Sequence, residues 1–422
     1  MLLSKIAGKP ILTGFCANCV GQKSAHSLVF MRFFDVCPII PYSSTLLTML
    51  VAFIYIYLLI LQITLLVSVK GRKLYRRIYF LMHSCYTFFR HQFHREVTDM
   101  RLTSTQSKHI QILRGLAIIA VVFIHNTPVG LPQVFIRPFL NFSVGLFLFL
   151  SGLLSRNSSW NPKKRLKKLL VPYLIWSFVY VCSQNLHTLP NVPLGYLKAV
   201  LFGNAESMMY YVFVYCEFTL LIPLIEKLAN SKYKYLGFVI SPLEIVFMRM
   251  IPMIAGYQHH QAMEILLEIS CLGWFSYFYL GYLLGNQKIV VRYRNSFLYA
   301  ILGISIVLQF LEAYWYRSLG ITNCGTQLKL STLFTGAIVA LIAYNFLNAS
   351  REYSVRALGL LGDQSFGIFF SHMAVMRVLG ALPFYEAYVI YPANALVALM
   401  VSFALCCIGK KILGKFSWYL GL

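Results

Sequence analysis

Apolar stretches long enough to cross a membrane recur along this chain, separated by short polar segments. The first lies at about residues 45–69, and ten more follow a basic, aromatic stretch at about 70–108. A bilayer core takes about 20 consecutive apolar residues per helix, and helices satisfy their own backbone hydrogen bonds in lipid. The pattern predicts an all-α protein with one N-terminal helix and a ten-helix core, of which the third helix is expected to be short. The core helices are centred near residues 119, 145, 178, 217, 245, 275, 306, 338, 368 and 398.

Composition supports a polytopic membrane protein. The 422 residues are 59% hydrophobic and 12% charged, with a mean hydropathy of +0.68. Soluble domains carry about 25% charged residues, so a soluble protein is excluded. A net charge of +24 in a soluble chain would indicate nucleic-acid binding. The chain has no RNP, zinc-finger or helix-turn-helix pattern, and the charge is better explained by membrane orientation.

Lysine and arginine gather in one alternate set of core loops. The opposite set holds only Arg137, Lys198 and Arg317. By the positive-inside rule, the basic loops and both ends of the core are predicted to be cytoplasmic, which places the extreme N-terminus outside. The predicted organisation is an N-terminal extension at 1–108 and a membrane domain at 109–422. Residues 1–99 are either a regulatory extension or lie ahead of a functional start at Met100.

One core helix carries two ionisable residues inside its apolar stretch. Arg114 and His125 are eleven positions apart. Eleven steps of about 100° return to within roughly 20° of the same helix face, and at about 1.5 Å per residue they span about 16 Å. Ionisable groups inside a membrane are rare and usually functional. The pair predicts a site with a cation toward the cytoplasm and an imidazole toward the outside.

Other core helices contribute further candidates. His372 is expected at a depth like that of the first-helix histidine, either as a second proton-transfer group or as a packing residue. Glu217 and Glu312 are candidate partners that would orient a histidine. Glu264 and Glu268 are four residues apart and share one helix face.

The sequence lacks the motifs of metal binding, acyl-serine catalysis and ATP hydrolysis. Cys16 and Cys19 form one C-x-x-C without a second pair or a suitably spaced histidine, so no metal site is expected. Glu244 and Arg249, five residues apart, are expected to neutralise each other. There is no G-x-S-x-G, DHHC or P-loop pattern to support an acyl-serine mechanism or ATP hydrolysis.

Five core segments carry a combination of motifs. They are Leu113–Ile118 leading to His125, Val144–Gly152, Lys163–Tyr173, Tyr210–Leu224 and Ser365–His372. In this order they resemble the acyltransferase-3 family of integral membrane acyltransferases, over about residues 110–410. Members transfer acetyl or other short acyl groups, usually from acyl-CoA, to hydroxyls of glycans, lipopolysaccharide, lipids or small molecules.

The resemblance implies a role for individual residues. His125 is the expected general base, with help from His372. Arg114, Arg165 and Lys168 are expected to bind the phosphates or pantetheine arm of acyl-CoA, with acetyl-CoA as the expected co-substrate. The family often has Arg-x-x-Arg where this chain has Arg165-Leu166-Lys167-Lys168, and lysine still binds phosphate as a point charge. Ser365, with Glu217 and Glu312, completes the set of candidate partners. No permanently bound cofactor and no metal is expected.

Two other classes stay open. A transporter or flippase for a lipid-linked or saccharide substrate also suits many helices with sparse internal charge, although such proteins often show matching broken helices in two halves. A non-catalytic membrane protein is disfavoured because Arg114 and His125 are both present. The expected setting is a bacterial cytoplasmic (inner) membrane, with lipids, acyl-CoA and a glycan or other hydroxyl acceptor as partners and no nucleic acid. Acceptor identity, acyl length and oligomeric state do not follow from the sequence.

Overall fold

A computed structural model of the chain describes residues 103–155, 160–185, 190, 192–254, 260–291, 293–349, 352–383, 385 and 390–422. In this part of the chain every regular element is a helix, which confirms the all-α prediction. The predicted helix at 45–69 lies outside the described residues, as does the basic stretch at 70–102.

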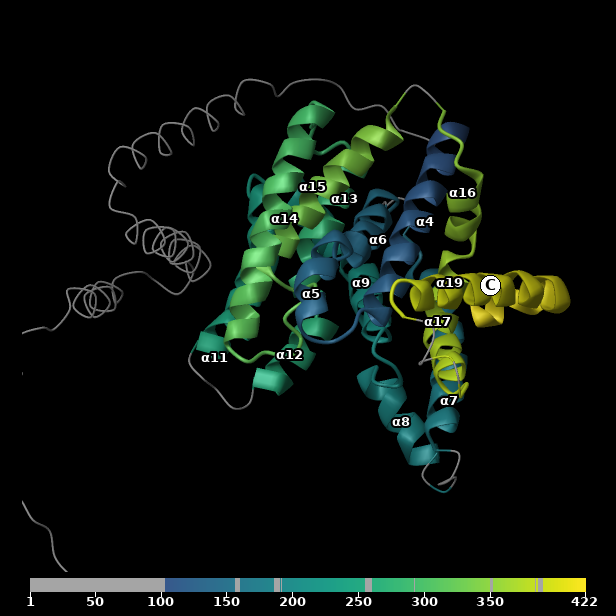
Figure 1. Ribbon diagram of the computed structural model, residues 1–422. Helices are drawn as coiled ribbons and strands as arrows, with labels where there is room; N and C mark the ends of the chain where they lie inside the picture. The colour runs from purple at the N-terminus through teal and green to yellow at the C-terminus, as the bar shows by residue number, and fades with distance from the viewer. Residues whose placement is uncertain are drawn as a thin grey trace, which may run out of the picture. The chain divides into compact units, whose positions relative to one another are not determined.

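The elements follow one another as helices joined by short connections (Figure 1). The first half comprises α4 (Ser104–Asn126), α5 (Leu131–Ile136), η3 (Arg137–Phe139), α6 (Phe142–Leu153), α7 (Pro162–Gln184), α8 (Val192–Phe202), α9 (Tyr210–Asn230), η6 (Lys234–Val239), α10 (Ile240–Ile245), the π-helix η7 (Val246–Met250) and α11 (Ile251–Ile254). The second half comprises α12 (His260–Ile269), η8 (Leu272–Trp274), α13 (Phe275–Gly285), α14 (Asn295–Ser318), α15 (Leu330–Leu347), α16 (Arg356–Asp363), α17 (Ser365–Gly380), α19 (Ala393–Leu413) and η9 (Gly414–Leu420).

Seven helical stretches of the described chain are long and apolar enough to cross a membrane. An eighth candidate is a pair, Met263–Ile269 with Leu272–Gly285, bent by 61° at its break. Each of the ten predicted centres falls within a helix, so the polytopic class is supported. That all ten cross the membrane stays a prediction.

The third core helix corrects one expectation. α7 has 23 residues rather than being short. Pro162 occupies its first turn, and the Asn161 side chain accepts a hydrogen bond from the Lys164 N–H at 3.0 Å. Both features start a helix, so the basic run expected in a loop forms the first turns of α7 instead. Arg165 and Lys168 therefore project from a helix.

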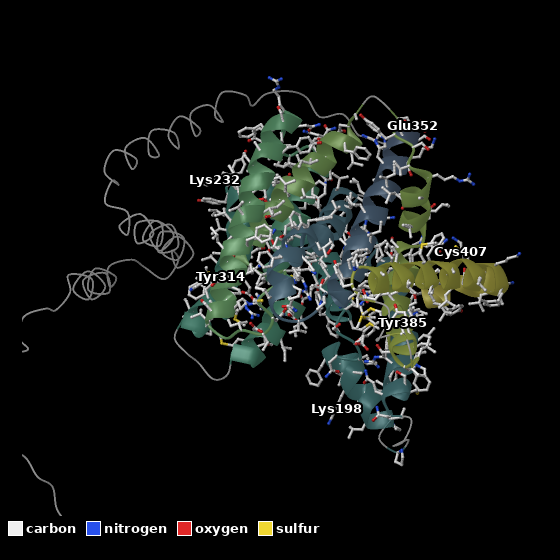
Figure 2. All side chains as sticks on the ribbon, in the orientation of Figure 1. Lys198, Lys232, Tyr314, Glu352, Tyr385 and Cys407 are labelled. Atoms are coloured by element: carbon white, nitrogen blue, oxygen red, sulfur yellow. The ribbon has the colours of Figure 1, made fainter. Side chains whose placement is uncertain are left out.

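The helix that carries Arg114 and His125 is fixed at its start. Thr103 and Gln106 form a reciprocal capping box, with both hydrogen bonds at 3.1 Å. One turn later Lys108 makes an exposed ion pair with Glu352 at 2.5 Å, at the end of the molecule where Glu352 is labelled in Figure 2. An exposed pair contributes about 0–1 kcal/mol, so the cap and the packing hold this end.

Glycines allow the helices around this core to approach closely. A Cβ on Gly115 of α4 would overlap the backbone of Leu358, and one on Gly362 of α16 would overlap the backbone of Gln111. The α6–α13 contact has the same character, because a Cβ on Gly281 would overlap the backbone of Phe149. Figure 1 shows α4 between α6 and α16. Small residues give such contact in membrane bundles, where dispersion drives packing.

Candidate active site

A cavity of about 730 Å³ runs between the helices, with walls from α4, the 127–137 segment, α6, α7, α9 and α17. Further walls come from α12, η8 and the segment before α15. The lining combines charged, amide, hydroxyl and aromatic side chains. They include Arg114, His125, Gln133, Arg137, Ser151, Arg165, Lys168, Tyr210, Tyr211, Glu268, Trp274, Asn323, Thr326, Gln327 and Ser365.

Three predicted donor-binding cations line this one cavity. Arg114 comes from the first half of α4, and Arg165 and Lys168 come from positions three residues apart on one face of α7. The Arg165 guanidinium donates to the Ser155 hydroxyl at 3.2 Å, which orients the side chain without neutralising it. Among the lining residues of the described chain Glu268 is the single carboxylate, so this group of cations is available to an anionic ligand.

The two predicted histidines lie side by side. Their ring centroids are 5.2 Å apart, with an interplanar angle of 51°. His125 lines the cavity, and its ring makes no hydrogen bond to another of the described residues. His372 is 0% exposed. Side chains from α4 and α17, far apart in sequence, thus form one pair.

The backbone fixes the tautomer of His372. Its Nδ1 lies 3.0 Å from the Ile368 carbonyl oxygen and 2.8 Å from that of Phe369. Carbonyl oxygens only accept, so Nδ1 carries the proton and Nε2 presents a lone pair. That Nε2 is buried without a hydrogen-bond partner among the described residues. It is therefore an unused acceptor beside His125.

Glu217 and Glu312, two of the predicted partners, lie elsewhere. Glu217 accepts a hydrogen bond from the Cys271 N–H at 2.7 Å. Glu312 accepts from the Ser331 N–H at 2.9 Å and also from the Ser331 hydroxyl, at the start of α15, where a carboxylate is favoured by the helix dipole. Neither lines the cavity, so neither is brought to His125. Ser365 does line it.

The expected Glu244–Arg249 neutralisation does not occur. Arg249 instead lies 3.4 Å from the Glu264 carboxylate and donates to the Leu328 carbonyl at 2.9 Å. The π-helical turn at Val246–Met250 changes which way residue 249 faces, because it adds a residue to the helical turn. A five-residue spacing on a regular helix does not anticipate that shift.

The sequence missed one part of the site. Arg137 enters the cavity from η3, together with Gln133 from α5. In the sequence Arg137 counted only as one of the few cations of the outer loops. The signal available was the Arg-Pro dipeptide just ahead of an apolar helix, since proline favours the first turn of a helix.

The chain is thus a polytopic helical membrane protein whose bundle holds a cavity with cations and a histidine pair. A family model described as an acyltransferase domain matches residues 108–410, which is most of the 422-residue chain. The protein belongs to the acyltransferase-3 family. Comparison with curated proteins and with solved structures gives no match.

Proposed function

We propose that this membrane acyltransferase transfers an acetyl or other short acyl group from acyl-CoA to a hydroxyl of a glycan or other envelope component. One observation carries the proposal. A single cavity joins Arg114, Arg165 and Lys168 to His125, which abuts His372. An anionic carrier and a proton-transfer group can therefore meet in one space.

The cations suit the donor. Acyl-CoA carries three phosphates, and arginine and lysine are the usual phosphate partners. Eleven residues separate Arg114 from His125, which is about 16 Å along a helix. An extended pantetheine arm would cover that distance and bring the thioester to the histidines.

His125 then acts as the base. It takes the proton of the acceptor hydroxyl as the oxygen attacks the thioester carbonyl carbon. The tetrahedral intermediate collapses with loss of the CoA thiolate, which receives that proton from the imidazolium. The products are the acyl ester and CoA-SH, and no other reactant is consumed. The two rings, whose centroids lie 5.2 Å apart, approach further during the proposed reaction. The free Nε2 of His372 then accepts a hydrogen bond from one nitrogen of His125, and the other nitrogen of His125 faces the hydroxyl.

Acetyl-CoA consumption by the purified, detergent-solubilised full chain with an envelope-glycan extract tests the proposal. We expect turnover in the wild type and a loss of about 10²–10⁴-fold in His125→Ala, the usual contribution of a general base. His109→Gln is the matched control, because His109 is a second histidine of α4 that does not line the cavity.

Two results would argue against acyl transfer. Full activity in a folded His125→Ala variant would remove the base assignment. Substrate flux in vesicles without acetyl-CoA consumption, and without CoA binding by calorimetry, would favour a transporter.

The charge distribution supports a proposal for the membrane orientation. We place the protein in a bacterial inner membrane with the basic loops inside, as the positive-inside rule suggests. Acyl-CoA would then enter from the cytoplasm and the acceptor from the opposite side. Cysteine accessibility at Lys198 and at Lys410, which are expected on opposite faces, tests this orientation.

A further inference from the structure

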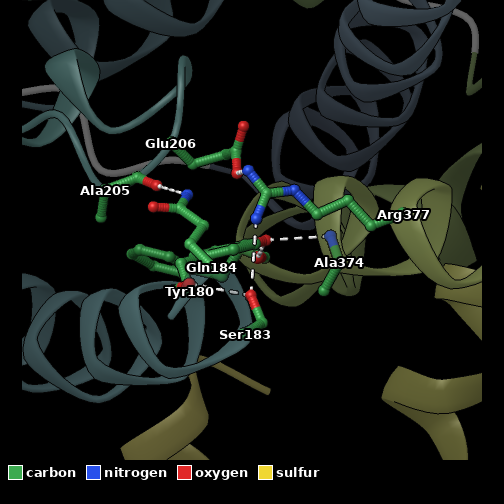
Figure 3. Close-up of polar contacts among 8 residues, drawn as sticks. Tyr180, Ser183, Gln184, Ala205, Glu206, Ala374 and Arg377 are labelled. Atoms are coloured by element: carbon green, nitrogen blue, oxygen red, sulfur yellow. Dashed lines mark hydrogen bonds and ion pairs between the residues drawn. The ribbon is translucent and has the colours of Figure 1, made fainter. Parts of the chain in front are cut away.

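Arg137 is a half-buried cation whose surroundings differ from those of two other arginines of the described bundle, Arg249 and Arg377. Arg249 has the Glu264 carboxylate at 3.4 Å. Arg377 forms an ion pair with Glu206 and contacts Ser183, and Figure 3 shows this cluster between α7, α17 and the segment before α9. Among the described residues no carboxylate lies within ion-pair distance of Arg137, and its Nε is buried without a hydrogen-bond partner.

The Arg137 side chain is nevertheless held in place. It begins η3, and its carbonyl accepts hydrogen bonds from the Leu140 and Asn141 N–H groups, both at 2.9 Å. Its stem packs against Gly325, where a Cβ would come within 2.8 Å of the Arg137 Cγ. The guanidinium is thus directed into the cavity by a fixed backbone and a glycine that leaves it room.

Buried charges are normally paired, because an unpaired one keeps its desolvation cost. Glu268 lines the same cavity but is not within ion-pair distance of Arg137. A guanidinium that is preorganised, lines a cavity and has no carboxylate at ion-pair distance among the described residues is suited to a ligand that brings an anion. The donor phosphates are a poor candidate, because the other three cations of the cavity are placed for them.

The surroundings of Arg137 suggest a sugar. The same part of the lining offers the amides of Gln133, Asn323 and Gln327, and the Gln327 Oε1 is another buried atom without a partner. Tyr210 and Trp274 add a stacked aromatic pair, with ring centroids 5.8 Å apart and planes at 15°. Amides beside an aromatic surface bind hydroxyls and the apolar face of a sugar ring.

Resting on the proposed function, we infer that Arg137 binds an acidic group of the acceptor, so that the preferred acceptor is a sugar bearing a carboxylate or a phosphate. The guanidinium fork matches either oxyanion in a bidentate manner. Arg137 then selects and positions the acceptor whose hydroxyl faces His125, which lines the same cavity.

Binding of matched sugars to the full-length solubilised protein tests this inference without requiring turnover. The probes are methyl β-D-glucuronide, methyl β-D-glucoside and glucose 6-phosphate, measured by calorimetry. We expect one or both acidic sugars to bind more tightly than the glucoside. Comparing the affinities of the glucuronide and the phosphate identifies whether the site prefers a carboxylate or a phosphate. Arg137→Gln should weaken acidic-sugar binding about tenfold to hundredfold, the usual effect of a lost charge-assisted hydrogen bond, and leave the glucoside unchanged.

Two variants accompany the test. Arg137→Lys keeps the charge without the fork and should retain part of the preference. Arg317→Gln removes an exposed arginine on the same side of the bundle that does not line the cavity, and it should bind like the wild type.

The inference fails if no acidic sugar binds, if the wild type binds acidic and neutral sugars equally, or if Arg137→Gln weakens both alike. It also fails if Arg137→Gln slows acetyl-CoA hydrolysis in the absence of acceptor, since Arg137 would then stabilise the oxyanion of the transition state. Selective acidic-sugar binding without acetyl-CoA consumption would instead remove the proposed function and leave the anion site.

Discussion

Replacing His372 tests whether the two histidines work as a unit. Asparagine places its amide nitrogen near the position of the histidine Nδ1, so His372→Asn can still donate to the Ile368 and Phe369 carbonyls, which lie 3.0 and 2.8 Å from that nitrogen. It has no acceptor where Nε2 lies. Glutamine reaches that more distant position, and His372→Gln can therefore restore an acceptor beside His125.

The expected loss of activity follows from the proposed hydrogen bond between His125 and the Nε2 of His372, which His372→Asn removes. During the reaction His125 becomes a cation, and a hydrogen bond to a charged group contributes about 1.5–3 kcal/mol. We expect kcat of His372→Asn to fall about tenfold to 150-fold, with KM for acetyl-CoA unchanged because the donor cations are untouched. His372→Gln should recover part of kcat.

The assay is initial-rate acetyl transfer by solubilised protein, with Ser371→Ala as the control. Ser371 is a buried neighbour on α17 whose hydroxyl lies near the Cys406 sulfur at 3.8 Å rather than near the histidines. Residues that act as a unit are not additive, so His372→Asn should cost little more in a His125→Ala background. Equal losses in both backgrounds, or full activity in His372→Asn, would refute the coupling.

Three further predictions concern the donor end, the packing and a buried lysine. Arg165→Gln and Lys168→Gln should each raise the KM for acetyl-CoA about tenfold. If these side chains contact the phosphates, the KM of each variant should no longer rise with added salt, as that of the wild type does. Unchanged KM values would contradict this. Gly281→Leu should abolish the monodisperse detergent-solubilised peak in size-exclusion chromatography, because its side chain would meet the Phe149 backbone, whereas Gly303→Leu, with nothing within 4 Å of its Cβ, should behave as wild type. Burial, with Arg249 and Arg137 nearby, lowers the pKa of Lys329, just before α15, to about 8. The unfolded chain holds that proton up to a pKa of about 10.4, so stability should rise as the pH increases from 8 toward 10. Lys329→Met should flatten this rise and stabilise the protein at pH 7 by about 3 kcal/mol, as read from thermal unfolding, and an identical pH profile in the variant would contradict the assignment.

Much of the helical organisation follows from the sequence because hydropathy reports directly on burial in lipid. Each predicted centre falls in a helix, and the start of α4 is encoded locally by Thr103 and Gln106. The positions where helices bend or break were harder to predict from the sequence. The bend between Ile269 and Leu272 and the π-helical turn around Arg249 depend on packing between elements, which a hydropathy pattern does not contain.

The residues of the candidate site were predictable where a polar side chain is energetically costly in an apolar helix, because such residues are usually functional. Arg114, His125 and His372 are expensive in an apolar segment, and the structure places all three at or beside one cavity. The carboxylates could not be assigned in this way, because a glutamate in a helix can have either of two roles. Glu217 and Glu312 accept hydrogen bonds from backbone N–H groups at helix starts and do not orient a histidine. Arg137 was not predicted, because in the sequence a single arginine beside a helix end cannot be distinguished from the basic residues that commonly flank membrane helices.

The separation between the cations and the histidine pair has an electrical consequence for the proposed reaction. A charge that crosses the membrane field changes its energy by about 2.3 kcal/mol per 100 mV. The charged phosphates would stay at the cation end while only the thioester end reaches His125. The hydroxyl proton leaves with the CoA thiol, and the acyl group is neutral. Turnover in energised vesicles should therefore be independent of membrane potential, so that the thioester bond alone drives the modification of the opposite surface.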